Sequence, residues 1–184
     1  EDTTLSVSRV ASVIGTTATA DVLQMLASGA VEVDAIETVL GSLGTADAVT
    51  MANGGNLSVS GIESVTGSAA SDDVISMLAA GGLRVSDIET VVGTTGVDGV
   101  WLLTAGALAV SAVETVVGTG DTADEITMLS TGTLHVRNVA SAVGTTATTD
   151  ILHLLTAGSI GISDLETVLG STGTDVVTVN NGGD

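Results

Sequence analysis

One acidic residue recurs at the same place in every repeat of this chain and offers the clearest chemistry. The aspartate column contains Asp21, Asp47, Asp73, Asp98, Asp124, Asp150 and Asp175. If each repeat forms one coil of a stacked structure, these carboxylates lie about 4.8 Å apart in a single row. Neighbouring unpaired carboxylates then repel each other by about 1 kcal/mol in water, and by more where water is excluded. Such a row requires either Ca²⁺ between the coils or hydrogen bonds from N–H groups of the turns.

Two of the aspartate turns carry a more specific pattern. Residues 93–98 read GTTGVD and residues 170–175 read GSTGTD, and in both cases a valine follows two positions after the aspartate. The pattern resembles the RTX (repeats-in-toxin) nonapeptide G-G-x-G-x-D-x-U-x of secreted bacterial proteins, although Thr or Ser replaces the second glycine. The resemblance implies a β-roll, secretion, and calcium held between successive turns by Asp carboxylates and turn carbonyl groups.

The candidate calcium ligands are therefore carboxylates of this one column. Asp98 and Asp175 have the spacing that the resemblance requires, whereas Asp47, Asp73 and Asp124 follow turns with one extra residue. That extra residue and the missing glycines favour the other interpretation, in which each aspartate caps its own turn through hydrogen bonds. Both interpretations remain open, with Ca²⁺ as the candidate cofactor.

Other polar residues suggest less chemistry. A second acidic column contains Glu37, Glu63, Glu89, Glu114 and Glu166. It runs beside a column of Ser and Thr, and we interpret the two columns as a solvated outer face. His135 and His153 occupy different columns without Cys or a further His at ligand spacing, so we interpret both as surface residues. No Ser–His–Asp or Cys–His set can be assembled from the repeat positions, and we expect no enzymatic activity.

The elements that carry these residues are set by an internal repeat. The chain contains seven tandem units of about 25–26 residues, which begin at Leu5, Val31, Leu57, Leu83, Leu108, Leu134 and Ile160. Each unit has three short apolar segments: alternating pairs such as Leu57 with Val59 and Ile75 with Met77, and a third segment, Ile62 to Val65, whose spacing indicates a bend. The segments are too short, too β-branched and too often interrupted by glycine for helices.

These features predict one all-β domain over residues 1–184. We expect a parallel β-solenoid, of the β-helix or β-roll type, with seven coils of about 25–26 residues, about three short strands per coil and a length of about 34 Å. A leucine-rich-repeat horseshoe is the alternative fold for units of this length, but no segment shows helical periodicity. Hydrophobic residues make up 44% of the chain and Trp101 is its one aromatic residue, which predicts a core of uniform aliphatic layers.

Charge excludes some partners. The formal net charge is −19, with three Lys and Arg residues in total, which argues against binding to nucleic acid or to an anionic membrane surface. No apolar run is long enough for a membrane-spanning helix. The sequence does not begin with Met, and we expect a processed or excised segment.

The ends of the array suggest self-association. Neither end carries a polar or helical capping unit, and an uncapped solenoid exposes unpaired strand edges. We therefore expect end-to-end stacking into a homo-oligomer or filament. The leading prediction is a structural module of a secreted bacterial surface filament, adhesin stalk or extracellular matrix, located outside the cell or at its surface. The alternative is a calcium-binding, RTX-like segment of a larger secreted toxin or enzyme.

Overall fold

The computed structural model describes residues 4–16, 20–70 and 72–181, and these residues form 21 short β-strands. Each repeat unit supplies three strands, which we call its opening, middle and closing strands. The opening strands are β1 (Thr4–Val7), β4 (Ala30–Asp34), β7 (Asn56–Ser60), β10 (Gly82–Ser86), β13 (Ala107–Ser111), β16 (Thr133–Arg137) and β19 (Ser159–Ser163). They contain the apolar pairs that begin each unit.

The other two strands of each unit follow the bend and the aspartate turn. The middle strands are β2 (Ser12–Ile14), β5 (Thr38–Leu40), β8 (Ser64–Thr66), β11 (Thr90–Val92), β14 (Thr115–Val117), β17 (Ser141–Val143) and β20 (Thr167–Leu169). The closing strands are β3 (Val22–Met25), β6 (Ala48–Met51), β9 (Val74–Met77), β12 (Gly99–Leu102), β15 (Glu125–Met128), β18 (Ile151–Leu154) and β21 (Val176–Asn181). The predicted strands are thus confirmed, and the bend falls at Gly61, whose φ is 64°.

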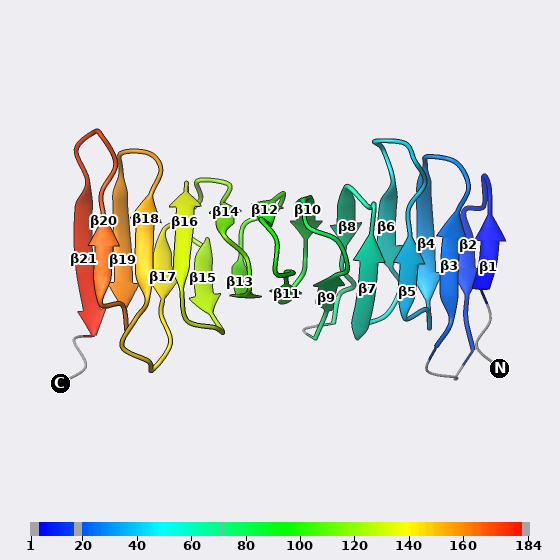
Figure 1. Ribbon diagram of the computed structural model, residues 1–184, viewed down its shortest axis with the longest axis horizontal. Coiled ribbons are helices and arrows are strands. Elements are labelled where there is room, and N and C mark those ends of the chain that lie inside the picture. The colour runs from blue at the N-terminus through cyan, green and yellow to red at the C-terminus, as the bar shows by residue number, and fades with distance from the viewer. Residues whose placement is uncertain (1–3, 17–19, 71, 182–184) are drawn as a thin grey trace.

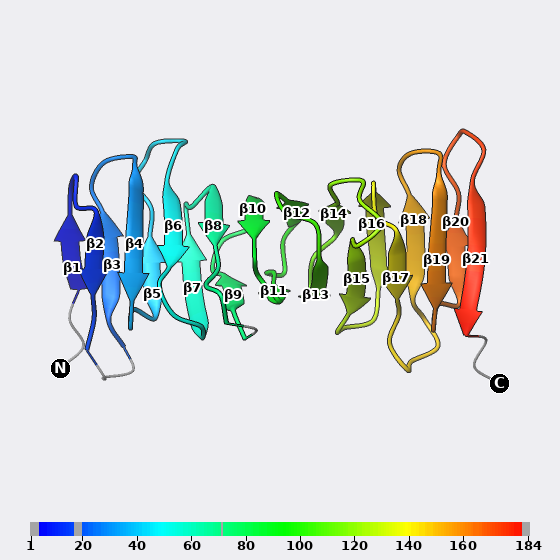
Figure 2. The ribbon, with the colours of Figure 1, turned by 180° about the vertical axis from the view of Figure 1, so that it is seen from behind.

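Successive strands lie alternately in two parallel sheets that face each other along the whole rod (Figures 1 and 2). Within the described residues, the odd-numbered strands form an 11-stranded sheet and the even-numbered strands a 10-stranded sheet. Every strand pair among the described residues is parallel, as in β10 with β12, where Leu83 pairs with Val100. The protein is a parallel β-solenoid, as the repeat predicted.

The predicted seven coils with three strands each are wrong. The chain returns to the same sheet after two strands, so the described residues make about ten coils, and one unit of three strands makes one and a half coils. At about 4.8 Å per coil the rod is roughly 50 Å long, not about 34 Å. The sequence repeats when the same type of strand recurs, which takes three strands. One coil is complete when the chain returns to the same sheet, which takes two strands. Corresponding residues of successive units therefore lie in opposite sheets.

A thin aliphatic core fills the space between the sheets. Strand residues alternate between buried and outward positions, and inward side chains such as Leu23, Val39, Leu57 and Ile75 are at most 1% exposed. Two facing sheets need only one layer of interdigitated side chains from each side, which Val, Leu and Ile can fill without Phe or Tyr. Among the described residues, no helix is long and apolar enough to cross a membrane.

Candidate functional site

The aspartates do not form one row, because successive units occupy opposite sheets. Asp21, Asp73, Asp124 and Asp175 precede strands of the 11-stranded sheet, whereas Asp47, Asp98 and Asp150 precede strands of the 10-stranded sheet. Strands of the two sheets begin at opposite edges of the rod. At one edge, neighbouring aspartates are three strands apart, about 14 Å. Their repulsion in water is about 0.3 kcal/mol before salt screening, so the predicted electrostatic need for Ca²⁺ does not arise from stacking.

The aspartates instead join neighbouring coils through hydrogen bonds, and Asp98 shows the complete arrangement over three coils. Asp98 is fully buried, and its Oδ1 accepts a 2.9 Å hydrogen bond from the Gly81 N–H of the preceding coil. Its Oδ2 accepts hydrogen bonds from the N–H and the hydroxyl of Thr94 in its own turn, at 2.6 and 2.8 Å. The Asp98 N–H donates to the Glu114 carboxylate of the following coil, at 2.7 Å. We call this arrangement of aspartate, turn hydroxyl, preceding glycine and following glutamate the Asp clip.

The same contacts recur along both edges of the rod. Asp47 binds Gly29, Ser42 and Glu63 in the corresponding way, with distances between 2.6 and 3.2 Å. Turn hydroxyls of the other clips come from Thr16, Ser68, Thr119, Thr145 and Ser171. Among the described residues, no buried side-chain nitrogen or oxygen lacks a hydrogen-bond partner. Capping therefore accounts for the aspartate column in structural terms.

The candidate calcium ligands all lie in these clips. Asp47, Asp73, Asp98 and Asp124 are fully buried, and Asp175 is half-buried. In the part of the chain that the structure describes, no three His, Cys, Asp or Glu side chains gather in a way that could hold a metal ion. A Ca²⁺ ion takes six to eight oxygen ligands and would have to replace the N–H and O–H donors now directed at each carboxylate. Calcium binding stays a prediction, and chelation tests it.

The glutamate column has a role that the sequence did not suggest. Its carboxylates are half-buried or exposed, and each accepts the backbone N–H of the aspartate 16 residues earlier, as Glu63 does from Asp47. Where the column has Ala140, the Asp124 N–H donates to the Asp121 carbonyl oxygen instead, at 3.3 Å. The column therefore belongs to the Asp clips. Its constant spacing from the aspartate column was the signal in the sequence.

A histidine pair was also missed. His135 and His153 are register partners on β16 and β18, and their ring centroids are 5.0 Å apart on the outer face of the 10-stranded sheet. The His135 Nδ1 lies 3.1 Å from the Glu114 carbonyl oxygen. The interval between the two histidines is the length of one coil here, so the assumption that a coil is a whole unit had placed them apart. In the described residues the pair has no third His, Cys, Asp or Glu beside it with which it could hold a metal ion.

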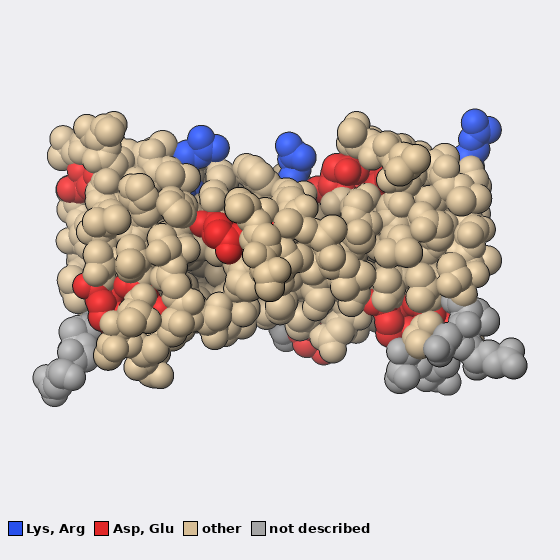
Figure 3. Space-filling view, in the orientation of Figure 1, with Lys and Arg blue, Asp and Glu red and all other residues tan. Residues whose placement is uncertain are grey.

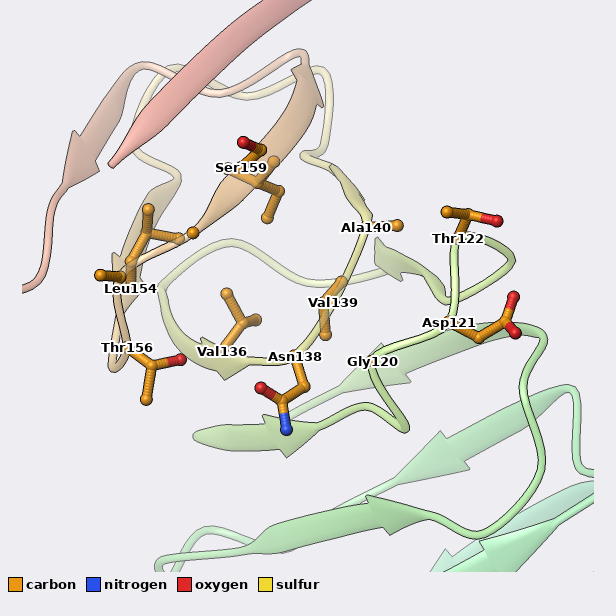
Figure 4. A pocket seen from close by; sticks show the side chains of 13 residues that line it. Gly120, Asp121, Thr122, Val136, Asn138, Val139, Ala140, Leu154, Thr156 and Ser159 are labelled. Atoms are coloured by element: carbon orange, nitrogen blue, oxygen red, sulfur yellow. The ribbon is translucent and has the colours of Figure 1, made fainter. Parts of the chain in front are cut away.

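Shallow grooves lie between coils at the corners of the rod. One of about 260 Å³ is lined by Val136, Val139 and Leu154, with the polar side chains of Asn138 and Asp121 nearby (Figure 4). Similar grooves occur at the corresponding corners around residues 33–57 and 85–107. The groove is therefore a recurrent feature of the repeat and not one specialised site.

The surface carries acidic groups at both edges and few cations. Figure 3 shows carboxylates at both edges of one face, with arginine side chains spaced along the upper edge. Five turn leucines are 45 to 63% exposed: Leu26, Leu78, Leu103, Leu129 and Leu155. Because they follow closing strands, they also alternate between the two edges.

The two end coils differ from the inner coils in exposure. Leu5 of β1 is 50% exposed, whereas its counterpart Leu57 is 1% exposed. At the other end, Val177 of β21 is 41% exposed, whereas its counterpart Leu152 is fully buried. In the described chain β1 and β2 start the two sheets, and β20 and β21 end them, so each end has unpaired strand edges above exposed core side chains.

Comparisons with protein-family models, with curated proteins and with solved structures gave no match to this chain.

Proposed function

We propose that the protein is a structural module that extends by end-to-end stacking of its coils. It would serve in a secreted bacterial surface filament, adhesin stalk or extracellular matrix, outside the cell or at its surface. The observation that carries the proposal is the pair of end coils. They expose side chains such as Leu5 and Val177, whose counterparts every inner coil buries, together with unpaired edges of parallel strands. Strand edges of this kind pair readily with a further strand.

The Asp clips support a mechanical role. A complete clip, as at Asp47 and Asp98, connects three coils through its aspartate, and the clips alternate between the two edges, so the coils are tied together on both sides of the rod. Hydrogen bonds to a buried carboxylate are stronger than those between neutral groups. A rod held in this way resists bending and the separation of its coils, which are the properties that a stalk or filament needs.

The calcium-binding, RTX-like segment remains the second candidate. One observation favours it: a unit contains three half-coils, which is about nine residues for each, the length of the RTX nonapeptide. Against it stand the N–H and O–H donors that already occupy the Asp98 carboxylate. The two candidates therefore differ in whether the fold needs the ion.

Electron microscopy of the purified protein, with and without a chelator, tests the proposal. We expect unbranched filaments of uniform width in both conditions, and sedimentation that becomes faster as the protein concentration rises. Single particles about 50 Å long at every concentration would contradict end-to-end stacking. Filaments or folded rods that form only with Ca²⁺ would favour the second candidate.

A further inference from the structure

The outer face of the 10-stranded sheet gathers side chains that are rare in this chain. The one tryptophan and two of the three arginines fall in a single row across neighbouring strands: Arg84 on β10, Trp101 on β12, Val117 on β14 and Arg137 on β16. Each member is the register partner of the next, so neighbours are about 4.8 Å apart and the two arginines about 14 Å apart. We call these four residues the Arg–Trp row.

The sheet leaves space for the indole ring of Trp101. An added Cβ at Gly82 would lie 2.7 Å from the Trp101 Cζ3 atom, and one at Gly99 would lie 3.0 Å from its Cη2 atom. The ring therefore occupies the volume that side chains at both positions would need. Neither glycine has a positive φ, and other units carry side chains at these positions, such as Asn56 and Glu125. Room for the indole explains the two glycines, and the half-buried ring is held in place before any partner binds.

Both arginines of the row lack a partner within the described chain. Arg84 and Arg137 are exposed, and their guanidinium groups make no hydrogen bond or ion pair with described residues. Arginine side chains project into solvent above the middle of the rod (Figure 3). Tryptophan and arginine are the residues that most often anchor protein interfaces, and guanidinium groups bind carboxylates through paired hydrogen bonds. The row therefore fits a protein surface that has two carboxylates about 14 Å apart and an apolar group between them.

One edge of the rod itself carries that pattern. Glu63 and Glu114 precede β8 and β14, which are three strands apart in the 10-stranded sheet, or about 14 Å. Strands of the 11-stranded sheet end at this edge, and Leu78, which follows β9, is 55% exposed there. Each glutamate uses its Oε2 in an Asp clip, and its Oε1 accepts no hydrogen bond from described residues. We call Glu63, Leu78 and Glu114 the Glu–Leu edge, and the same order recurs at Glu114, Leu129 and Glu166.

The row and the edge match in order as well as in charge. From the first charged group to the apolar group is one coil in both surfaces, and from there to the second charged group is two coils. We infer that the Arg–Trp row binds the Glu–Leu edge of a second copy of this chain, which lies alongside the first and runs in the same direction. The facing pairs are Arg84 with Glu63, Trp101 with Leu78, and Arg137 with Glu114.

The opposite edge of the rod does not carry the same order. There Glu37 and Glu89 are separated by Ala52 in place of the leucine, and the next set, which contains Leu103, ends at Ala140 instead of a glutamate. The Arg–Trp row thus selects one edge. Because the row and that edge are different surfaces, each copy uses both at once, and rods join side by side into bundles instead of closed pairs. All the contacts lie on inner coils, so the inference does not depend on end-to-end stacking.

Fluorescence of Trp101 tests the contact directly, because it is the one tryptophan of the chain. Emission and acrylamide quenching are recorded while the protein concentration is raised to about 1 mM, since a contact of this size is weak. We expect a blue shift and weaker quenching as Leu78 of the second copy covers the ring. End-to-end stacking alone leaves both signals unchanged, because it does not reach β12.

Paired variants identify the two surfaces. Arg84→Gln with Arg137→Gln removes the charges of the row. Glu63→Gln with Glu114→Gln removes those of the edge and keeps an oxygen for the clip. Each double variant alone should need at least about tenfold more protein for the same shift. A mixture of the two should regain the shift of the copy whose row is intact. The matched control, Glu37→Gln with Glu89→Gln on the opposite edge, should behave as the natural protein.

Two outcomes would overturn the inference and leave end-to-end stacking in place. The first is a Trp101 signal that does not change with protein concentration, or an equal loss in the matched control. The second is a shift that appears on adding polygalacturonate but not on raising the protein concentration, which would assign the Arg–Trp row to an anionic polysaccharide. Electron microscopy of the same samples reports end-to-end filaments separately.

Discussion

The corner at Gly93–Asp98 and the corner at Gly170–Asp175 have nearly the same sequence but different surroundings. Asp98 and Val100 are fully buried, whereas Asp175 is half-buried and Val177 is 41% exposed. Both aspartates accept hydrogen bonds from their own turn and from the preceding coil. Only Asp98 has a following coil in the described chain. That coil supplies Glu114 and places the Ala112 carbonyl group directly against Gly93. The difference isolates what one neighbouring coil contributes.

The largest expected effect is the difference in stability between alanine substitutions at the two glycines. Gly93→Ala would place a methyl group against the Ala112 carbonyl oxygen and should lower the free energy of unfolding by about 3 kcal/mol. Gly170→Ala should lower it by less than about 1 kcal/mol, because only the Asp175 side chain is near. Urea denaturation of dispersed protein measures both values. Equal losses would contradict the comparison.

The next largest effect concerns the two aspartates. Asp98→Asn replaces a carboxylate oxygen that accepts two donors of Thr94 with an amide nitrogen, and should cost about 2 kcal/mol of stability. Asp175→Asn should cost about 1 kcal/mol, because that residue is half-buried and solvent can replace part of the lost bonding. Thermal unfolding of the two variants, with Asp72→Asn at an exposed position as the control, measures the difference. A larger loss at Asp175 would show that its clip is complete without a further coil.

A gain of stability should sharpen the comparison between clips with and without a following glutamate. Ala140 stands where Glu114 serves Asp98, and the Asp124 N–H donates to the Asp121 carbonyl oxygen at 3.3 Å instead. Ala140→Glu should therefore supply a carboxylate acceptor for the Asp124 N–H and raise the free energy of unfolding by about 1 kcal/mol. Ala11→Glu is the matched control, because no aspartate of the described chain lies in a coil before it. Urea denaturation measures both variants, and an equal gain from the control would contradict the role of the clip.

The smallest expected effect is that of chelation. Because hydrogen bonds from the turns already engage the Asp98 and Asp175 carboxylates, EDTA should change Tm by less than about 2 °C, which corresponds to at most about 1 kcal/mol. Calorimetry before and after adding excess Ca²⁺ provides the measurement. A rise of ten degrees with Ca²⁺ would instead support the RTX-like candidate and locate its ions at these corners.

The sequence predicted local structure well because local structure depends on patterns that lie within one unit. Alternation at Leu57 and Val59 corresponds to strand β7, and the spacing of Ile62 and Val65 reflects the turn over residues 61–63, which begins one residue earlier than that spacing indicates, at Gly61. The number of strands in a coil could not be predicted in this way, because it depends on which strands pair between successive coils. With three strands in a unit and two in a coil, the two periods coincide only after two whole units, which make three coils.

The errors at the candidate site follow from the same cause. A single aspartate row and two separate histidines both assumed that one unit is one coil. Once the coil is known to contain two strands, His135 and His153 become neighbours, and Asp47 moves to the edge opposite Asp21. The Asp clip itself could have been recognised from the constant spacing between the aspartate and glutamate columns. Its geometry, however, required knowledge of which coil follows which.

One and a half coils per unit also make the parity of the repeat number matter. Each unit carries the chain into the opposite sheet, so any run of an odd number of units ends half a coil out of phase with its beginning, and any run of an even number ends in phase. Insertion or loss of one unit within the array would therefore turn everything that follows it by a half-turn about the rod axis. Insertion or loss of two units would change only the length of the rod, by three coils.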